Sequence, residues 1–282
     1  MRIINTAEEM QRTALSLRAA GRKIGLVPTM GFLHAGHASL LDVCRPECDV
    51  LAVSIFVNPT QFGPNEDLDK YPRDFDHDCE LCESHGADIV FAPTPETIYA
   101  PDHSTWVVEE VLSKPLCGRT RPIHFRGVAT VVTKLFNLTQ AQVAVFGRKD
   151  AQQALIIERM VRDLNIPVRI IVAPLVRDED KVALSSRNRY LSAGERGAAR
   201  SISRSLLAAE QTLTVGGAAA AAGEVEKVRA AITDAGGTVD YVEALDADTL
   251  SGVTAGSRRV LLAAATWFGA TRLIDNIMVE YK

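Results

Sequence analysis

The chain has 282 residues, of which 47% are hydrophobic, and its formal net charge at pH 7 is −4. This length suits one large domain or two ordinary ones, and the charge argues against a broad nucleic-acid surface, which would need an excess of lysine and arginine. Acidic residues near the N-terminus and the lack of any run near the roughly 20 apolar residues of a membrane span argue against a signal peptide and a membrane partner, so we expect a cytoplasmic enzyme.

The first predicted elements alternate between helix and strand. Thr6 to Glu9 match a capping box, and the helix that they open extends to Ala20. An apolar strand is predicted over Ile24 to Val27. It leads into PTMGFLHAGHASL, where a glycine turn opens a second helix.

The His-Ala-Gly-His motif in this stretch is the main candidate for chemistry. His34 and His37 stand three residues apart, so both rings lie on one side of the first helical turn. Gly36 lets a ligand approach the backbone, and a helix N-terminus favours a phosphate. The pattern favours a nucleotide-phosphate site. The alternatives are a surface histidine beside a buried one, or a zinc site that would need further ligands.

The next strand ends in polar residues. A nearly continuous apolar run from Asp49 to Val57 is typical of a parallel strand covered on both faces. Asn58 and Gln61 follow it directly, which is where α/β enzymes place ligand-binding groups. The alternative is a turn-capping asparagine and a solvated glutamine. A helix over Asp74 to His85 and a strand over Asp88 to Phe91 complete this part.

The five cysteines do not suggest a disulfide framework. Two close pairs, Cys44 with Cys48 and Cys79 with Cys82, fall in helix-like segments. Such spacing places small apolar side chains on buried helix faces. A four-thiolate zinc site is the alternative.

The middle of the chain holds two basic segments. A strand is predicted over Thr105 to Glu110, and the arginine-rich loop Cys117 to Gly127 after it suggests a phosphate lid or a solvated loop before a helix over 128–138. A strand over Val143 to Phe146 then meets Gly-Arg-Lys-Asp and a helix over 151–164. Lys149 is placed there as a point charge for a phosphate.

The last hundred residues change in character. After a strand over Val168 to Val172, the run Ser185-Ser-Arg187 resembles a mobile phosphate clamp or an exposed turn. A helix from Ser192 to about Leu213 and a low-complexity hinge or helix start over 216–223 come next. Strands are expected over 239–244, 259–265 and 273–280. This change predicts two domains, residues 1–176 with alternating strands and helices and residues 177–282 with an α+β organisation.

Six stretches, in order and almost end to end, resemble the pantothenate synthetase (pantoate–β-alanine ligase) family of the His-x-Gly-His superfamily. They are PTMGFLHAGHASL, SIFVNPTQFGPNEDLDKYPRD, RPIHFRGVATVVTKLFN, VFGRKDAQQ, LSSRNRYLS and RLIDNIMVE. The resemblance implies an α/β fold and a homodimer. Residues 1–176 would form a Rossmann-like parallel sheet domain that binds ATP and pantoate, and residues 177–282 a smaller C-terminal α+β domain that closes over the substrates as a lid.

The resemblance also implies the reaction. The carboxylate of pantoate attacks the α-phosphorus of ATP in the presence of Mg²⁺, and pyrophosphate leaves. The amine of β-alanine then attacks the pantoyl adenylate, which gives pantothenate and AMP. The alternatives are an adenylyltransferase of the same superfamily and a non-catalytic ATP-binding homologue.

The resemblance finally implies roles for single residues. His37 is the expected proton donor and His34 its phosphate-binding partner, with Lys149 and Arg187 as cationic catalytic groups. Asp78 matches an acidic position associated with the metal. Pantoate is expected to contact Gln61, Gln153 and Asn58. The expected ATP-contacting residues are Met30, Gly31, Phe32, Leu33, His34, Ala35, Gly36, His37, Gly147, Arg148, Lys149, Asp150, Val176, Leu184, Ser185, Ser186 and Arg187.

Three positions depart from the family pattern. Ala35 and Arg148 each stand where glutamate is usual, and Lys181 stands where glycine is usual. None of the three removes a group expected to bind phosphate or substrate. Lys181 restricts the backbone of a loop that is expected to close, so it bears on the rate of closure.

Overall fold

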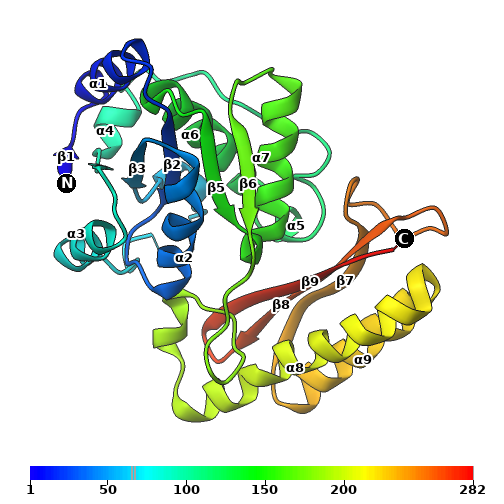
Figure 1. The fold of residues 1–282 in the computed structure, drawn as a ribbon. Coiled ribbons are helices and arrows are strands. Elements are labelled where there is room, and N and C mark those ends of the chain that lie inside the picture. The colour runs from blue at the N-terminus through cyan, green and yellow to red at the C-terminus, as the bar shows by residue number, and fades with distance from the viewer. Residues whose placement is uncertain (65, 67, 282) are drawn as a thin grey trace. The chain divides into compact units, whose positions relative to one another are not determined.

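The computed structural model describes residues 1–64, 66 and 68–281, and it divides into two compact units (Figure 1). The first unit contains Met1–Arg148 and Gln152–Pro174. The second contains Lys149–Ala151 and Leu175–Lys282. A lid role for residues 177–282 stays a prediction.

The first unit is built on a sheet of six parallel strands, which confirms the Rossmann-like expectation. The strands are β1 (Arg2–Ile4), β2 (Ile24–Thr29), β3 (Val50–Ile55), β4 (Ile89–Phe91), β5 (Val143–Gly147) and β6 (Arg169–Ala173), in the order β1-β4-β3-β2-β5-β6. The order reverses between β2 and β5, because the chain builds outward to β3 and β4 and then returns. Ligands of such sheets bind at the carboxyl ends of the strands at this reversal.

Helices surround this sheet. They are α1 (Ala7–Ala19), α2 (Ala35–Cys44), α3 (Phe75–Ser84), α4 (Pro95–Ile98), α5 (Cys117–Thr120), α6 (His124–Thr139) and α7 (Ala151–Asp163), with short 3₁₀ turns η1 (Arg45–Glu47), η2 (Pro59–Gln61) and η3 (Arg148–Asp150). The predicted capping box of α1 is half formed. The Thr6 side chain accepts a hydrogen bond from the N–H of Glu9 at 3.3 Å, but the Glu9 side chain pairs with Arg2 at 2.7 Å.

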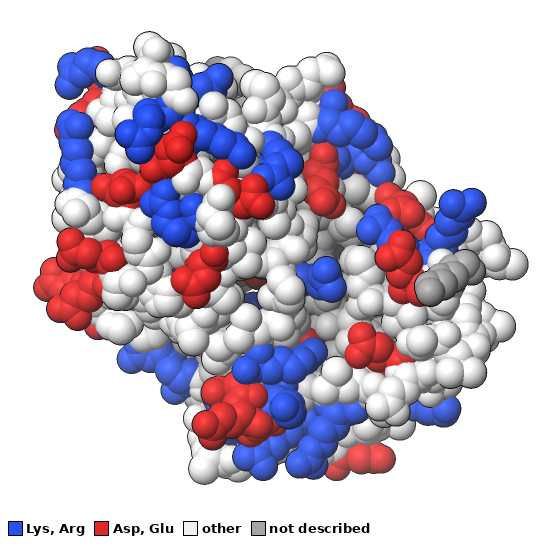
Figure 2. Space-filling view, in the orientation of Figure 1, with Lys and Arg blue, Asp and Glu red and all other residues white. Residues whose placement is uncertain are grey.

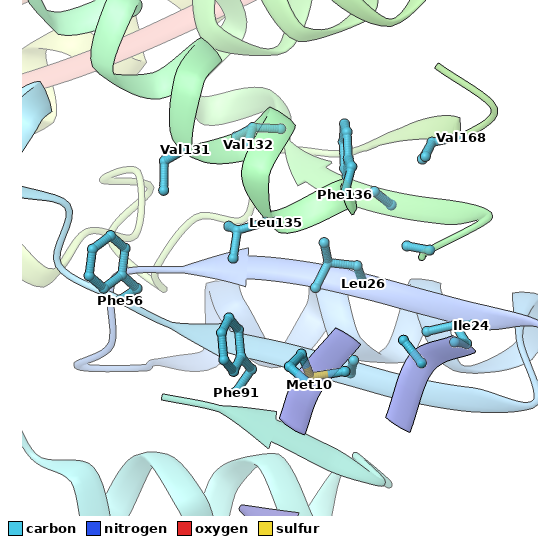
Figure 3. Packing of buried hydrophobic residues seen from close by; sticks show 14 of the residues in the cluster. Met10, Ile24, Leu26, Phe56, Phe91, Val131, Val132, Leu135, Phe136 and Val168 are labelled. Atoms are coloured by element: carbon cyan, nitrogen blue, oxygen red, sulfur yellow. The ribbon is translucent and has the colours of Figure 1, made fainter. Parts of the chain in front are cut away.

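Both faces of the sheet are buried, as expected for a parallel sheet with apolar strands. Leu26 of β2 lies in a core with Met10 of α1 and Phe136 of α6 (Figure 3). The next residue, Val27, lies in a separate core with Leu41 of α2. Successive strand side chains point to opposite faces, so one apolar run fills two cores.

One predicted strand of the first unit is absent, and one observed strand was not predicted. Thr105 to Glu110 do not form a strand, because the N–H of Val107 donates to the Thr130 hydroxyl of α6 at 3.0 Å instead of to a neighbouring strand. The edge strand β1 was not predicted, since three residues are too short for a periodic pattern to show.

The second unit is an α+β layer pair. Helices α8 (Ala193–Gly216) and α9 (Ala221–Asp234) pack on an antiparallel sheet of β7 (Thr238–Asp246), β8 (Arg259–Phe268) and β9 (Thr271–Glu280), with 3₁₀ turns η4 (Ser186–Tyr190) and η5 (Gly217–Ala220). Ser192 and Glu195 cap α8 reciprocally. The alanine-rich run predicted as a hinge or helix start forms η5 and the first turn of α9.

The described residues include no helix long and apolar enough to cross a membrane. Figure 2 shows basic and acidic side chains interspersed over the face that it draws.

Candidate active site

The exit of β2 is fixed to its neighbour β3. Thr29 pairs in register with Ile55, so the segments that follow both strands begin at the same edge of the sheet. The Thr29 hydroxyl donates to the carbonyl of Ser54 at 2.8 Å and accepts from the N–H of Gly31 at 3.2 Å. The chain therefore leaves β2 along a defined path.

The turn before the histidines has a left-handed backbone. Gly31 has φ 79° and Phe32 has φ 52°. A Cβ on Gly31 would lie 2.9 Å from Oδ2 of Asp78, so only glycine fits there. Oδ2 of Asp78 accepts from the N–H of Phe32 at 2.8 Å, and Oδ1 accepts from the N–H of Leu33 at 2.6 Å. A buried carboxylate thus holds a turn whose φ values non-glycine residues rarely adopt.

His34 and His37 cap the start of α2 reciprocally. Nδ1 of His34 accepts from the N–H of Gly36 at 3.1 Å, and Nδ1 of His37 accepts from the N–H of His34 at 3.3 Å. The ring centroids are 4.1 Å apart. A ring nitrogen that accepts carries no proton, so each neutral ring holds its proton on Nε2. The pair can therefore present two Nε2–H donors.

The capping refines the expected phosphate contacts. The N–H groups of Gly36 and His37 are already bonded, to the His34 ring and to the His34 carbonyl at 2.7 Å. The expected anion site therefore relies on imidazole donors more than on these two backbone groups. Both histidines are half-buried, so a ligand can reach them.

Gln61 is 7% exposed and contacts Met30, which directly precedes the same turn. Its Oε1 accepts from Nδ2 of Asn58 at 3.2 Å, and its Nε2 donates to Sδ of Met30 at 3.0 Å. A thioether is a weak acceptor, so an oxygen of a substrate can replace it at little cost. The predicted contact between Gln61 and pantoate requires such a replaceable partner.

Asn58 has a different surrounding from the one expected of a substrate contact. It is 1% exposed. Its Nδ2 also donates to the carbonyl of Gly127 at 3.1 Å, and its Oδ1 accepts from the hydroxyls of Thr60 and Tyr99 at 2.9 Å each. These contacts give Asn58 the role of holding Gln61. A direct contact between Asn58 and pantoate stays a prediction.

The arginine-rich loop supports the same glutamine from its backbone side. Nδ1 of His124 lies 2.9 Å from the carbonyl oxygen of Gln61, and Nη2 of Arg121 donates to that oxygen at 3.3 Å. Arg121 also pairs with Glu66. Burial alone would raise the pKa of Glu66, but hydrogen bonds and charge from Arg121 lower it below its usual value. Arg121 is thus a structural residue, and the expected phosphate lid is not supported there.

Asp78 is a poor match for the predicted metal site. It is 1% exposed, and burial raises its pKa although the two N–H donors oppose that shift. Both oxygens already accept backbone hydrogen bonds, whereas Mg²⁺ usually keeps several waters beside one or two carboxylates. Among the described residues, no group of three or more His, Cys, Asp or Glu side chains could hold a metal ion.

The end of β5 approaches the same helix. A Cβ on Gly147 would lie 3.8 Å from Leu40 of α2. In the first turn of α7, Gln152 is buried and binds the loop before α5, with Nε2 donating to the carbonyls of Leu112 and Pro115 at 2.8 and 2.7 Å. Gln153, the predicted pantoate contact, is half-buried. The structure therefore gives the two adjacent glutamines different surroundings.

The other predicted phosphate groups belong to the second unit. The carbonyl of Lys149 accepts from Nδ2 of Asn276 on β9 at 3.0 Å, and Nζ of Lys149 lies 3.8 Å from Asp150, a long ion pair. Ser185 caps η4 by accepting from the N–H of Arg187 at 3.3 Å. Ser186 and Arg187 form the first turn of η4, and Val176 accepts from the N–H of Leu184 at 3.0 Å. The predicted phosphate clamp, Ser185 to Arg187, lies in a folded 3₁₀ turn and its cap, and a role in phosphate binding stays a prediction.

The segment before the clamp is tied to β9. Arg177 forms two hydrogen bonds with the carboxylate of Asp275, at 2.6 and 2.9 Å. Asp275 is 3% exposed, and burial raises its pKa although Arg177 opposes the shift. Lys181 has φ 72°, which glycine would adopt without strain.

The cysteines are packing residues in this structure. Cys44 and Cys82 are fully buried in the core that contains Val27. The sulfur atoms of Cys44 and Cys48 each lie 2.7 Å from the position of a Cβ on Gly25, so they are neighbours and leave no room for a side chain there. All five cysteines are free thiols.

Several supporting residues could not be found from sequence pattern. Asp78, Gly127 and His124 act on segments 45 or more residues away in the chain. A Cβ on Gly127 would lie 2.5 Å from the carbonyl of Thr60, so glycine allows α6 to touch η2. The available signal for His124 and Gly127 was their place in one of the recognised stretches, and for Asp78 it was the match to an acidic position of the family.

Comparison with known proteins gives a consistent result over the whole chain. The family model described as Pantoate-beta-alanine ligase matches residues 2–278. The pantothenate synthetase of Acetivibrio thermocellus is 49% identical over 285 residues, with 99% of this chain and 100% of that protein covered. The pantothenate synthetase of Thermotoga neapolitana is 50% identical over 284 residues, with the same coverage.

Solved structures agree in fold. A crystal structure of pantothenate synthetase from Thermus thermophilus has a TM-score of 0.89 and 42% identity, covering 98% of this chain and 99% of that one. A crystal structure of pantoate-beta-alanine ligase from Francisella tularensis, complexed with beta-gamma ATP and beta-alanine, has a TM-score of 0.81 and 33% identity, covering 98% and 97%.

Proposed function

Because the chain belongs to the pantoate–β-alanine ligase family, we propose roles for its residues in the ligation of pantoate to β-alanine. The enzyme uses ATP, forms pantoyl adenylate, and releases AMP and pyrophosphate. The observation that carries the proposal is the reciprocal capping of His34 and His37, because it leaves both rings with an Nε2–H. Two adjacent hydrogen-bond donors at the end of β2 suit a phosphate chain.

The histidines act on the departing pyrophosphate. Negative charge grows on this group as pantoate attacks the α-phosphorus, and preorganised donors stabilise such charge in the transition state. In this proposal, His34 binds a phosphate oxygen. His37 is the general acid and donates its Nε2 proton in a hydrogen bond to the departing oxygen, while the ring itself stays neutral. The pair is held by its own helix caps, so the rings need little rearrangement when the reaction begins.

Pantoate is bound by neutral amides. Its carboxylate is itself the nucleophile, and an arginine paired with it would draw off the attacking charge. Gln61 offers Nε2–H, and Gln153 offers a second amide. Placement of two reactants can supply roughly 7–11 kcal/mol of a barrier, against about 10²–10⁴-fold from one general acid. Orientation by the glutamines therefore contributes more than proton transfer.

The second unit supplies positive charge in this proposal. Lys149, Ser185 and Arg187 bind the phosphates of ATP, and residues 177–282 act as the lid. Mg²⁺ bound to the phosphates of ATP would shield their charge. A homodimer, which the resemblance implies, is part of the proposal, and sedimentation would test it. The proposal places the protein in the reducing cytoplasm, and five free thiols support that location.

The test separates the two half-reactions. Pyrophosphate, AMP and ADP are followed with ATP, Mg²⁺ and pantoate, with and without β-alanine. Pantoate-dependent pyrophosphate, and AMP with pantothenate on adding β-alanine, are expected. ADP would mean transfer of the γ-phosphoryl group and would contradict the mechanism. ATP binding without turnover would indicate a non-catalytic homologue.

A further inference from the structure

The carboxylate of Asp78 holds the turn that carries the two histidines. We propose that Asp78 is a positioning residue for His34 and His37 and that it does not bind the metal. This inference rests on the proposed role of the histidines in adenylate formation. It gives a new function to the acidic position that the family resemblance associates with Mg²⁺.

The contacts of Asp78 leave its oxygens committed to the backbone. Oδ2 accepts from Phe32 and Oδ1 from Leu33, at 2.8 and 2.6 Å, across 46 and 45 residues of sequence. Oδ2 also lies 2.9 Å from the position of a Cβ on Gly31. The carboxylate is therefore pressed against the turn itself. A magnesium ion with its bound waters would need both that space and those lone pairs.

Backbone hydrogen bonds of the turn connect Asp78 to the imidazole rings. Three successive N–H groups have fixed acceptors, since those of Phe32 and Leu33 bind Asp78 and that of His34 binds Nδ1 of His37. The direction of the His34 N–H depends on the peptide plane before it, and Leu33 is part of that plane. A change at Asp78 therefore moves the group that sets the tautomer and orientation of His37.

Asp78 is itself held firmly. It lies in the first turn of α3, where a negative charge is favoured by the helix dipole. Asp74 caps this helix by accepting from the N–H of His77 at 3.3 Å. One turn after Asp78, Cys82 is fully buried in the core shared with Val27 of β2. The carboxylate is thus a rigid link between α3 and the motif.

The test compares Asp78→Asn with Asp76→Asn, an exposed carboxylate in the same helical turn. An amide has one oxygen, so one backbone N–H in Asp78→Asn faces an NH₂ group instead of an acceptor. The single-turnover rate of adenylate formation should fall by about 10- to 100-fold, as for other small misplacements of reacting groups. Release of pantothenate from supplied pantoyl adenylate and β-alanine should not change, because no pyrophosphate departs in that step. Asp76→Asn should match the wild type.

A magnesium titration separates the two roles of Asp78. If Asp78 positions the histidines, the Mg²⁺ concentration that gives half the maximal rate should be the same in Asp78→Asn and in the wild type. If Asp78 binds the metal, that concentration should be clearly higher in Asp78→Asn. An increase, equal losses in both half-reactions, or a wild-type adenylation rate would each overturn the inference. If circular dichroism shows that Asp78→Asn is not folded, Gly31→Ala tests the same contact, because its Cβ displaces Oδ2 of Asp78. A selective loss of adenylate formation is again expected. An equal loss in both half-reactions overturns the inference.

The outcome also distinguishes this inference from the proposed function. If the wild type releases no pantoate-dependent pyrophosphate, the proposed function fails. If the wild type does so and His37→Ala impairs it while Asp78→Asn does not, only the positioning role fails.

Discussion

The imidazole of His37 accepts a hydrogen bond from the backbone N–H of His34, with 3.3 Å between the two nitrogen atoms. The His34 ring accepts one from the N–H of Gly36. Each ring thus acts as a helix cap through Nδ1 and carries its proton on Nε2. The motif combines a structural function and a chemical one in the same two side chains.

This pairing predicts the tautomers and the effect of removing one ring. Long-range ¹⁵N–¹H spectra at a pH where both rings are neutral should show His34 and His37 with the proton on Nε2. His37→Ala should lower the adenylation rate by about 10²–10⁴-fold, as expected for a lost general acid. Its free energy of unfolding should fall by only about 0.5–2 kcal/mol, the usual cost of a lost helix cap.

The control for His37 is His85→Ala. His85 pairs with Asp42 on the surface at 2.7 Å and should leave adenylation unchanged. An unchanged single-turnover rate in His37→Ala would remove His37 from the mechanism.

Gln61→Ala should weaken the binding of pantoate far more than the binding of ATP. The variant loses an amide that can make two hydrogen bonds, and each is worth about 0.5–1.5 kcal/mol. Titration calorimetry with each ligand measures the difference. Gln11→Ala, which removes an exposed amide that reaches Asn137 at 3.4 Å, is the matched control. Equal losses for both ligands would argue that Gln61 only supports the fold.

Arg177→Met should destabilise the protein by about 3–5 kcal/mol, because it leaves the buried carboxylate of Asp275 without its partner. The double variant Arg177→Met/Asp275→Leu should recover much of that loss. Chemical unfolding of the three proteins tests this. A single variant as stable as the wild type would contradict it.

The same pair predicts a pH dependence. Burial raises the pKa of Asp275 above its unfolded value, and Arg177 opposes that rise. Without Arg177 the folded pKa should rise further, and a carboxyl with a raised folded pKa loses stability as pH increases through that value. The penalty of Arg177→Met should therefore be smaller at acid pH than at neutral pH.

Lys181→Gly should stabilise the loop before the clamp. Lys181 has φ 72°, and a left-handed conformation costs a residue with a side chain roughly 1–2 kcal/mol. Part of this gain is offset by the greater freedom of glycine in the unfolded chain, so an increase of up to about 1 kcal/mol is expected. Lys181→Ala keeps the strain and removes the charge, so its stability should stay near that of the wild type. If Lys181→Gly and Lys181→Ala change the free energy of unfolding by the same amount, the loss of the side chain and not the backbone conformation determines the change in stability.

Cys48 should be the most reactive thiol of the five. A hydrogen bond from Cys44 lowers the pKa of Cys48 to about 7, against the effect of burial and with help from the charge of Arg45. The thiolate is the nucleophile, so alkylation by iodoacetamide should rise as pH increases through about 7. Peptide mass spectrometry after brief labelling measures this, and Cys48→Ser should remove the fast phase. A fast phase that begins only near the pKa of an ordinary thiol would contradict the prediction.

Local signals were enough for much of the architecture. Continuous apolar runs predicted parallel strands, and their alternation with helices predicted an α/β domain, because strand and helix periods depend on neighbouring residues. The Rossmann-like sheet was implied by the family resemblance. The three-residue spacing of His34 and His37 placed their rings together for the same reason. The helix caps at Thr6 and Ser192 are also local.

What the tertiary structure alone decided is the support around those rings. Asp78 reaches Phe32, His124 reaches Gln61, and Asn58 reaches Gly127, each across more than 40 residues. Such contacts form only when the sheet order brings distant segments to one edge, and no local period encodes that order. For this reason the sequence by itself identified the motif and the family reaction, while only the fold showed that Asp78 and Asn58 bind the protein's own backbone and side chains.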